Sequence, residues 1–484
     1  MSAETGILSY GAYIPRKRLQ RAAIHATNKW FAGGLGGLAK GERAIANWDE
    51  DAVTMAVEAA RDTLEGVERA DVATISLAST TLPFADRLNA GIVKEALTLS
   101  DATAALDLGG SQRAATSGLI QALAAARGGA APHLALASEL RLSRPASEAE
   151  MVQGDAAAGF LVGQGDIIAR YLGSHSVTID FVDHFRASGA DFDYSWESRW
   201  IRDEGYTGMT VQALKGAFAT LGVEPGAIDR FIMPITLKGV AEGVAKKAGI
   251  RAEAVADRLS ATVGDSGVAH PFLLLAAALE EAKAGEKILL AGFGQGVDLL
   301  LFEATGKAAS LAHRAGVAGS LARGVKDDNY ARWLFHRGSL LLDRGMRAEN
   351  DEKQPGTTLW RNRKAVLGLV GGRCTKTGTV QFPRSDISVN PNDHSVHTQE
   401  DYPLAEKRAR IVTYTADSLT YSPAPPSYYG MIDFDGGGRM MAEITDCSAE
   451  DVEVGRELRM MFRIKAVDER RDFTKYFWKA VPVG

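Results

Sequence analysis

The chain has 484 residues, of which 46% are hydrophobic and 24% are charged, and its formal net charge at pH 7 is −5. This composition is typical of a globular protein of about two to four domains, and the small negative charge argues against binding to nucleic acid or to an anionic membrane surface. No apolar run reaches the roughly 18 to 20 residues that a membrane span needs, and the N-terminus lacks the pattern of a secretory signal, so we expect a cytoplasmic protein.

Apolar strands alternate with amphipathic helices over residues 1–305, which predicts an α/β fold with buried sheets. The stretch DAVTMAVEAARDTL at residues 51–64 is one such helix. The stretch ALDL at residues 105–108 is a buried strand, and a glycine turn leads from it into the N-terminus of a helix. Enzymes often place a nucleophile at such a position, but the residue here is Gln112, and an amide is not a nucleophile.

The turn, helix and strand at residues 109–138 have a counterpart at residues 264–294, where a small-residue turn again precedes an Ala/Leu-rich helix and a buried strand. A duplicated α/β half folds most simply as two similar halves packed about a pseudo-two-fold axis. The helix N-termini at residues 111–115 and 266–270 would then lie close together. Their free backbone N–H groups predict an oxyanion site.

Two titratable residues at the second helix N-terminus are candidates for a general base. Asp265 is either an anion favoured by the helix dipole or only an N-cap. His270 is either a base or a buried structural histidine. A third candidate, His184, lies in residues 173–206, a segment rich in aromatic and charged side chains that is either a substrate-contacting loop or a polar surface excursion. The other candidates for substrate binding in that segment are His175, Asp183, Arg186, Tyr194, Trp196 and Tyr206.

The glycines of GFGQG at residues 292–296 do not match a nucleotide-binding fingerprint, because their spacing is wrong and no βαβ unit surrounds them.

The composition changes after residue 305. Residues 306–363 are polar and irregular and predict a connecting segment with short helices. Residues 364–484 are richer in Thr, Tyr, Val and Phe and predict a small β-barrel. The two cysteines, Cys374 and Cys447, are not spaced as a metal-binding pair, and no thiol nucleophile precedes them.

The two aligned helices, the strand LLAGFGQG and the segments GDAAAGFLVG and GILSYGAYIPRKRL together resemble the thiolase superfamily, and within it the branch of hydroxymethylglutaryl-CoA synthase and the type III ketoacyl synthases. This resemblance implies an α/β domain at residues 1–305 with a layered α/β/α/β/α arrangement. Its two βαβαβ-type halves lie at about residues 1–170 and 206–305, with an inserted loop region at residues 171–205. The resemblance also implies a homodimer, and it places Gly294 and Gln295 in a loop that lines the active site.

Residues 364–484 resemble the OB-fold module that accompanies thiolases acting on acyl-CoA, which usually carries a four-cysteine zinc ribbon. The ribbon is degenerate here, because only Cys374 is kept, and Thr377, Ile387 and Asn390 stand about where the other thiols would be. One thiol cannot make a tetrahedral zinc site, so we expect no metal. We also expect no cofactor apart from the coenzyme A that belongs to the substrate.

Every member of the usual catalytic set of this family is replaced. The nucleophilic cysteine falls on Gln112, the histidine falls on Ile235, and the asparagine falls on Asp265. The base-bearing glutamate would fall near residues 79–81, where no glutamate stands. Cysteine-dependent acyl transfer is therefore not expected, but an amide can still donate a hydrogen bond to a thioester oxygen and stabilise an enolate.

We therefore expect an acyl-CoA lyase or synthase that makes or breaks a carbon–carbon bond next to the thioester, most directly by aldol or retro-aldol chemistry on a 3-hydroxyacyl-CoA. Asp265, His270 or His184 would be the base, and Gln112 would hold the enolate, with Ser111 and Arg113 beside the substrate. Three alternatives stay open: decarboxylation of a malonyl-type thioester, a condensation like that of hydroxymethylglutaryl-CoA synthase with Ser111 as the nucleophile, and a non-catalytic acyl-CoA-binding subunit.

Overall fold

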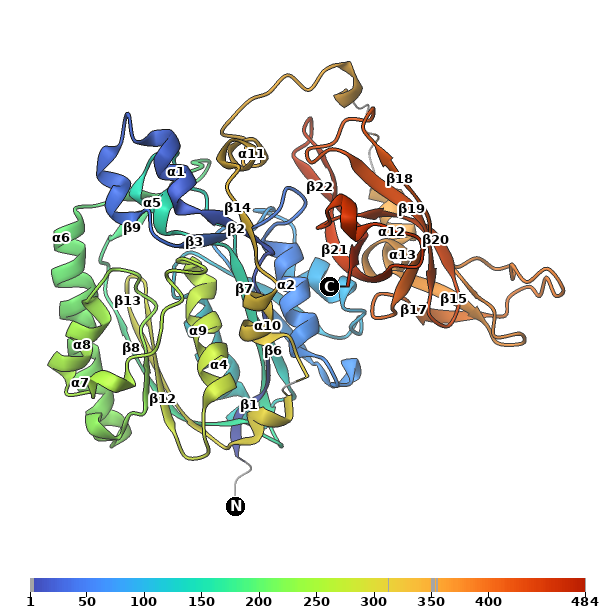
Figure 1. The fold of residues 1–484 in the computed structure, drawn as a ribbon. Coiled ribbons are helices and arrows are strands. Elements are labelled where there is room, and N and C mark those ends of the chain that lie inside the picture. The colour runs from blue at the N-terminus through green and yellow to red at the C-terminus, as the bar shows by residue number, and fades with distance from the viewer. Residues whose placement is uncertain (1–3, 312, 350–352, 354–355, 484) are drawn as a thin grey trace. The chain divides into compact units, whose positions relative to one another are not determined.

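The computed structural model of the chain describes residues 4–311, 313–349, 353 and 356–483 (Figure 1). The chain divides into two compact units. Unit 1 consists of Met1–Ala46, Asp51–Gly91 and Ser100–Ser339, and unit 2 consists of Asn47–Glu50, Ile92–Leu99 and Leu340–Gly484. Two short segments from the first hundred residues therefore fold with the C-terminal part of the chain.

Unit 1 is built on a nine-stranded sheet with the strand order β11-β12-β13-β8-β1-β7-β6-β4-β5. In the first half, β4 is parallel to β5 and β6, and β6 is antiparallel to β7. In the second half, β11 is parallel to β12, and β12 is antiparallel to β13. This repetition, together with the antiparallel contact of β1 with β8 at the centre, confirms the duplicated fold. The strands are β1 (Thr5–Tyr13), β4 (Thr74–Ala78), β5 (Ala104–Leu108), β6 (His133–Glu139), β7 (Ala156–Gln164), β8 (Ala169–Thr178), β11 (Arg230–Ile232), β12 (Lys287–Phe293) and β13 (Gly296–Ala304).

Three layers of helices cover and separate the two halves of the sheet. Helices α4 (Ala114–Arg127) and α9 (His270–Glu281) lie side by side in Figure 1, and their apolar residues share one core with both halves. Helix α2 (Ala52–Thr63) packs on β1 and β7, and α7 (Thr210–Leu221) with α8 (Val240–Ala248) covers the second half. Asp51 caps the N-terminus of α2, and its side chain forms a capping box with Thr54.

The segment between the halves differs from the predicted loop. Residues 171–178 belong to β8, which pairs with β13 along its length. Buried and half-buried positions alternate along this strand as far as Gly173, and residues 174–178 are half-buried or exposed. The true excursion follows β8 and contains β9 (His184–Phe185), β10 (Tyr194–Ser195) and α6 (Ser198–Trp200), which leads through a π-helix (Ile201–Met209) into α7.

The first part of the predicted connecting segment belongs to unit 1. Strand β14 (Val325–Asp327) pairs with β2 (Lys17–Gln20), and β2 pairs with β3 (Glu42–Ile45). The C-terminal segment of unit 2 begins at Leu340, earlier in the chain than residue 364, where the sequence changes to a β pattern. The remaining helices of unit 1 are α1 (Arg21–Asn28), α5 (Glu148–Val152), α10 (Gly316–Ala322) and α11 (Tyr330–His336), and α3 (Asn89–Ala96) crosses from unit 1 into unit 2.

Unit 2 contains a closed five-stranded barrel with the order β18-β19-β20-β22-β21, which confirms the predicted all-β domain. Its core contains Met460, Phe462 and Trp478, all of which are fully buried. The barrel strands are β18 (Ala409–Asp417), β19 (Ser427–Phe434), β20 (Arg439–Ile444), β21 (Glu457–Asp468) and β22 (Phe473–Pro482). The unit also contains α12 (Gly356–Arg361), α13 (Arg363–Gly368) and a small sheet of β15 (Val370–Cys374), β16 (Val380–Gln381) and β17 (Gln399–Pro403).

Hydroxyl and amide groups stand where the zinc ribbon of the resembled module would carry thiols. Cys374 Sγ lies 3.2 Å from Thr398 Oγ1, Thr377 Oγ1 donates to Thr379 Oγ1 at 2.9 Å, and Asn390 Nδ2 donates to the same oxygen at 2.9 Å. Within the described residues, no group of three or more His, Cys, Asp or Glu side chains is arranged to hold a metal ion. The absence of zinc stays a prediction.

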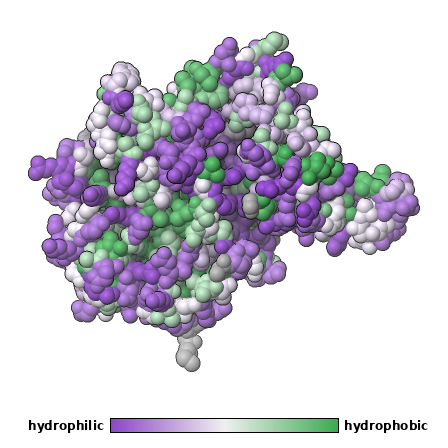
Figure 2. Space-filling view, viewed as in Figure 1, coloured by the Kyte–Doolittle hydropathy of each residue, from purple (hydrophilic) through white to green (hydrophobic). Residues whose placement is uncertain are grey.

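Hydrophilic residues cover most of the face seen in Figure 2. In the part of the chain that the structure describes, no helix combines the length and the apolar character that crossing a membrane requires.

Candidate active site

Gln112 stands at the head of α4, where the chain leaves β5. The turn between them passes through Gly110, whose φ of +82° is a conformation that favours glycine. Ser111 Oγ donates to the carbonyl of Gly294 at 3.0 Å and accepts from the backbone N–H of Arg113 at 3.3 Å. These bonds fix the first turn of α4 against the β12–β13 turn and leave the Gln112 side chain at the start of the helix.

Two neighbours determine how the amide of Gln112 is oriented. Arg141 Nη1 donates to Gln112 Oε1 at 3.4 Å, and Gln112 Nε2 donates to Thr80 Oγ1 at 3.4 Å. Because a guanidinium can only donate, the amide oxygen must face Arg141 and the NH2 group must face Thr80. One amide hydrogen is used by Thr80, so Gln112 keeps a second one for another acceptor.

Glu139, at the end of β6, is a residue of this site that sequence reasoning missed, as it missed Arg141 and Asp193. Its side chain is fully buried and accepts from Thr80 Oγ1 at 2.7 Å and from the Thr80 backbone N–H at 3.1 Å. Burial raises the pKa of Glu139, against the opposing effects of Arg141 and of the Thr80 hydrogen bonds. A signal was available: β4 and β6 are parallel, so a carboxylate ending the apolar strand HLALASE falls at the same sheet edge as residues 79–81.

A hairpin formed by β9 and β10 lies against the same site. Asp193 Oδ2 accepts from Arg141 Nη2 at 2.8 Å, and Asp193 Oδ1 accepts from Arg186 Nη1 at 3.1 Å. Arg186 also donates to the backbone carbonyl of Thr80. Burial lowers the pKa of Arg141, but the carboxylates of Asp265, Asp193 and Glu139 outweigh it and raise that pKa above its ordinary value. Arg141 is therefore a permanent cation at the centre of the site.

The turn that precedes α9 in the second half faces Gln112, as the pseudo-two-fold axis predicts. A Cβ added at Gly267 would lie 2.9 Å from Gln112 Oε1 and 2.6 Å from Arg141 Nη1, so a larger residue there would displace these two side chains. Asp265 Oδ1 accepts from the backbone N–H of Gly267 at 2.8 Å, and its charge acts on Arg141. Asp265 thus caps its own turn and also belongs to the site.

His270 and His184 form no hydrogen bond with Gln112 among the described residues. His270 is fully buried, and its Nδ1 accepts from the Ser266 backbone N–H at 3.4 Å and lies 3.2 Å from Ser266 Oγ. Burial lowers the pKa of His270, which keeps the ring neutral. His184 Nδ1 pairs with Asp183 Oδ2 at 3.0 Å on the hairpin.

The other candidates are placed around the site rather than at its centre. Arg113 donates to Asp298 Oδ1 at 2.7 Å and to Thr178 Oγ1 at 2.6 Å, so it ties α4 to the second half. Tyr206 packs edge-on against Phe293 at 4.8 Å between ring centroids, and burial, then Asp183 and Asp265, raise its pKa. The remaining three are Tyr194 and Trp196, which are 60% and 51% exposed on the hairpin, and Gln295, which occupies the β12–β13 turn with a φ of +48°.

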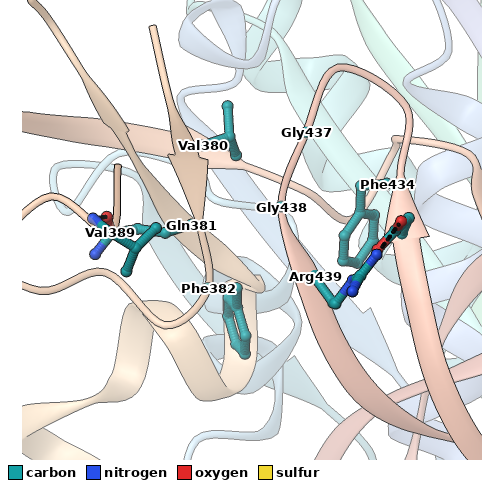
Figure 3. Close-up of a pocket in the computed structure, with 9 residues that line it drawn as sticks. Val380, Gln381, Phe382, Val389, Phe434, Gly437, Gly438 and Arg439 are labelled. Atoms are coloured by element: carbon teal, nitrogen blue, oxygen red, sulfur yellow. Dashed lines mark hydrogen bonds and ion pairs between the residues drawn. The ribbon is translucent and has the colours of Figure 1, made fainter. Parts of the chain in front are cut away.

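Unit 2 contains a separate pocket of about 430 Å³ between β16 and the β19–β20 turn (Figure 3). Its polar lining groups already have partners. Arg439 Nε and Nη2 donate to the Asp433 carboxylate at 2.5 and 2.8 Å, and Gln381 Oε1 accepts from the Val389 backbone N–H at 3.0 Å.

Comparisons with known proteins agree with the division of the chain into two units. A family model described as 3-oxoacyl-[acyl-carrier-protein] synthase III, C terminal, matches residues 218–300, and one described as the C-terminal OB-fold domain of ChsH2 matches residues 402–463. The chain is 28% identical over 305 residues to hydroxymethylglutaryl-CoA synthase from Methanocaldococcus jannaschii, covering 62% of this chain and 88% of that protein. It is 26% identical over 350 residues to the same enzyme from Thermococcus sibiricus, covering 70% and 97%.

Solved structures share the fold. MvaS in complex with 3-hydroxy-3-methylglutaryl coenzyme A superposes with a TM-score of 0.61 at 18% identity, over 83% of this chain and 100% of that chain. The 3-oxoacyl-[acyl-carrier-protein] synthase III of Aquifex aeolicus superposes with a TM-score of 0.54 at 19% identity, over 62% and 99%.

Proposed function

We propose that this chain, which joins a thiolase-like domain homologous to hydroxymethylglutaryl-CoA synthases to a C-terminal OB-fold domain like that of ChsH2, makes or breaks a carbon–carbon bond next to a CoA thioester without a cysteine acyl-enzyme. One observation carries the proposal: the nucleophile position at the head of α4 holds an amide that is oriented as a hydrogen-bond donor beside the buried carboxyl group of Glu139. The substrate class follows from the relatives, one of which was solved with a hydroxyacyl-CoA bound.

The residues suit a retro-aldol cleavage of a 3-hydroxyacyl-CoA. Glu139 accepts the hydroxyl proton of the substrate through Thr80 Oγ1, which already donates to Glu139 at 2.7 Å. The bond between Cα and Cβ then breaks, its electron pair moves toward the thioester carbonyl, and an aldehyde or ketone leaves. The second N–H of Gln112 Nε2 donates a hydrogen bond to the enolate oxygen. The proton held by Glu139 returns to Cα and completes the acyl-CoA, and the reverse sequence is an aldol addition.

The protonation behaviour of Glu139 supports this role. A general acid and base works best when its pKa lies near the operating pH, and burial moves the pKa of Glu139 upward, toward that range. His270 is a poorer base, since burial lowers its pKa and its Nδ1 is turned to Ser266.

Ser111 is not supported as a replacement nucleophile. Its hydroxyl hydrogen is donated to the carbonyl of Gly294 at 3.0 Å, and a carbonyl oxygen cannot act as the general base that serine nucleophiles require. A condensation through a seryl acyl-enzyme is therefore disfavoured.

Two further features belong to the proposal. We propose a homodimer, because β5 is the edge strand of the sheet and Leu106 on it is 37% exposed, which leaves a row of backbone groups available to a second copy. We also propose a cytoplasmic location, since CoA thioesters are made and consumed inside cells.

The test is to incubate the purified protein with a panel of 3-hydroxyacyl-CoA and malonyl-type CoA thioesters and to identify the products by mass spectrometry. Wild-type protein is expected to release an acyl-CoA together with an aldehyde or ketone, and Gln112→Ala is expected to do so about 10²-fold more slowly. Gln121→Ala is the matched control, because Gln121 is exposed on the same helix. Carbon dioxide as the product would indicate decarboxylation instead. Intact thioesters with bound CoA would indicate a binding subunit.

A further inference from the structure

Five groups at the site form a closed ring of hydrogen bonds. Gln112 Oε1 accepts from Arg141, and Arg141 donates to Asp193. Asp193 accepts from Arg186, Arg186 donates to the Thr80 carbonyl, and Thr80 Oγ1 accepts from Gln112 Nε2. Gln112, Arg141 and Thr80 lie at the head of α4 or just after β6 and β4, and Arg186 lies on the outgoing arm of the hairpin, opposite Asp193. Asp193 is the carboxylate that the returning arm of the hairpin inserts into the ring.

The hairpin that supplies Asp193 is a lightly attached element. Residues 187–191 at its tip are exposed, and so are the rings of Phe185, Tyr194 and Trp196, which pack on one another at 5.6 to 6.3 Å between centroids. Besides the ring itself, Arg144 lies over the Phe192 ring at 5.1 Å. Elements with few buried apolar contacts open at low free-energy cost, so the presence of Asp193 in the ring depends on the position of the hairpin.

Asp193 controls the placement of Arg141 relative to Gln112. The charge-assisted bond from Arg141 to Asp193 is 2.8 Å long, whereas the bond from Arg141 to Gln112 is 3.4 Å long, so the carboxylate is the stronger anchor. Without it, Arg141 would turn toward its other two carboxylate neighbours, Asp265 and Glu139. The Gln112 oxygen would then lose the donor that fixes which way its amide faces.

We propose that Asp193 is a positioning residue, which acts through Arg141 to hold the Gln112 amide with its NH2 group toward the reacting thioester. The inference rests on the proposed function of Gln112 as the enolate donor. Asp193 and Arg186 both belong to the hairpin, so the orientation of the donor depends on the hairpin keeping its place against Arg141 and Thr80.

The experiment compares Asp193→Asn with Asp191→Asn, which removes an exposed carboxylate two residues away on the same hairpin. The side-chain amide resonances of Gln112 are recorded by NMR in glutamine-labelled protein and assigned by their loss in Gln112→Ala. Asp193→Asn is expected to shift the Gln112 amide pair and to speed its hydrogen exchange, and Asp191→Asn is expected to leave both unchanged. On a thioester that wild type turns over, Asp193→Asn is expected to lower kcat about 10- to 100-fold with little change in KM.

An unchanged Gln112 amide in Asp193→Asn would overturn the proposal. Arg186→Gln breaks the ring on the other side of Asp193 and is expected to shift the same resonances, so the test does not depend on one variant folding. The amide measurement needs no substrate, and it therefore stands even if the thioester panel shows no turnover. Turnover with an unresponsive amide would defeat the role of Asp193 alone and leave the proposed function intact.

Discussion

Two buried arginines, one in each unit, are each surrounded by three carboxylates. In unit 1, Arg141 donates to Asp193 at 2.8 Å, and the charges of Asp265 and Glu139 also act on it. In unit 2, Arg463 lies 2.8 Å from Asp446, 3.0 Å from Glu50 and 3.8 Å from Asp49. Burying such a cation is costly unless it is paired, and both units solve that problem with acidic neighbours.

The two clusters differ in the groups that surround them. In unit 2, Lys479 adds a second cation, 3.1 Å from Asp49 and 4.0 Å from the Trp48 ring, and Thr445 Oγ1 donates to Asp49 at 2.9 Å. These bonds tie residues 47–50 to the barrel. In unit 1, Arg141 leads to an amide that keeps a free hydrogen and to a carboxyl whose pKa is raised. Under the proposed function, the cluster in unit 2 holds its segments together, whereas the cluster in unit 1 positions groups for chemistry.

The largest effect is expected from a substitution that breaks the ion cluster around Arg463 in the barrel. Arg463→Met leaves Asp49, Glu50 and Asp446 without the cation between them, so it is expected to lower the free energy of unfolding by about 3 to 5 kcal/mol. Urea unfolding followed by circular dichroism measures it. The control is Arg410→Met in the same barrel, because Arg410 is 55% exposed and its pairing with Glu457 at 3.5 Å is worth about 1 kcal/mol or less. Equal losses in both variants would show that the Arg463 cluster is not a stabilising element.

The corresponding substitution in unit 1, at Glu139, is expected to lower the rate of turnover. Glu139→Gln keeps an acceptor for Thr80 but cannot take a proton, so kcat is expected to fall about 10³-fold with the fold retained. Because the pKa of Glu139 is raised, its basic form appears only above the ordinary range of a glutamic acid. The wild-type rate should therefore rise with pH through that raised pKa, and the variant should lack this rise. Glu148→Gln, at an exposed position on α5, is the control, and equal activity in both variants would remove Glu139 from the mechanism.

A smaller loss is expected when Gln112 keeps its shape and loses its hydrogens. Gln112→Glu retains an oxygen for Arg141 but presents no N–H to an enolate, so turnover is expected to fall about 10²-fold. Steady-state kinetics on the substrate identified by the panel provide the measurement. Wild-type rates in Gln112→Glu would mean that the amide is not the enolate donor.

The smallest expected effect on chemistry is at His270. His270→Asn removes a buried neutral ring, so it is expected to cost about 1 to 3 kcal/mol of stability and to leave the pH dependence of turnover unaltered. Thermal unfolding and a pH–rate profile measure the two effects. A lost limb of the profile near neutral pH would identify His270 as the base in place of Glu139.

What the sequence predicted and what it missed have a common physical basis. The duplication and the position of Gln112 follow from local turns and helices, which repeat along the chain. Glu139 was missed because its partner Thr80 is 59 residues away and only the parallel pairing of β4 with β6 brings them together. Arg113 was predicted beside the substrate, yet its ion-pair partner, Asp298, lies 185 residues away on β13. Side-chain networks between distant strands leave no periodic pattern in the sequence, so they become visible only once the fold is known.

The central claim is carbon–carbon bond chemistry without an acyl-enzyme, and the intact mass of the protein during turnover tests it most directly. The protein is mixed with a thioester that it consumes, quenched while product is accumulating, and weighed by mass spectrometry. We predict the unmodified mass at every time, while acyl-CoA and its carbonyl partner accumulate. A protein heavier by the acyl group, with the adduct lost in Ser111→Ala, would contradict the account.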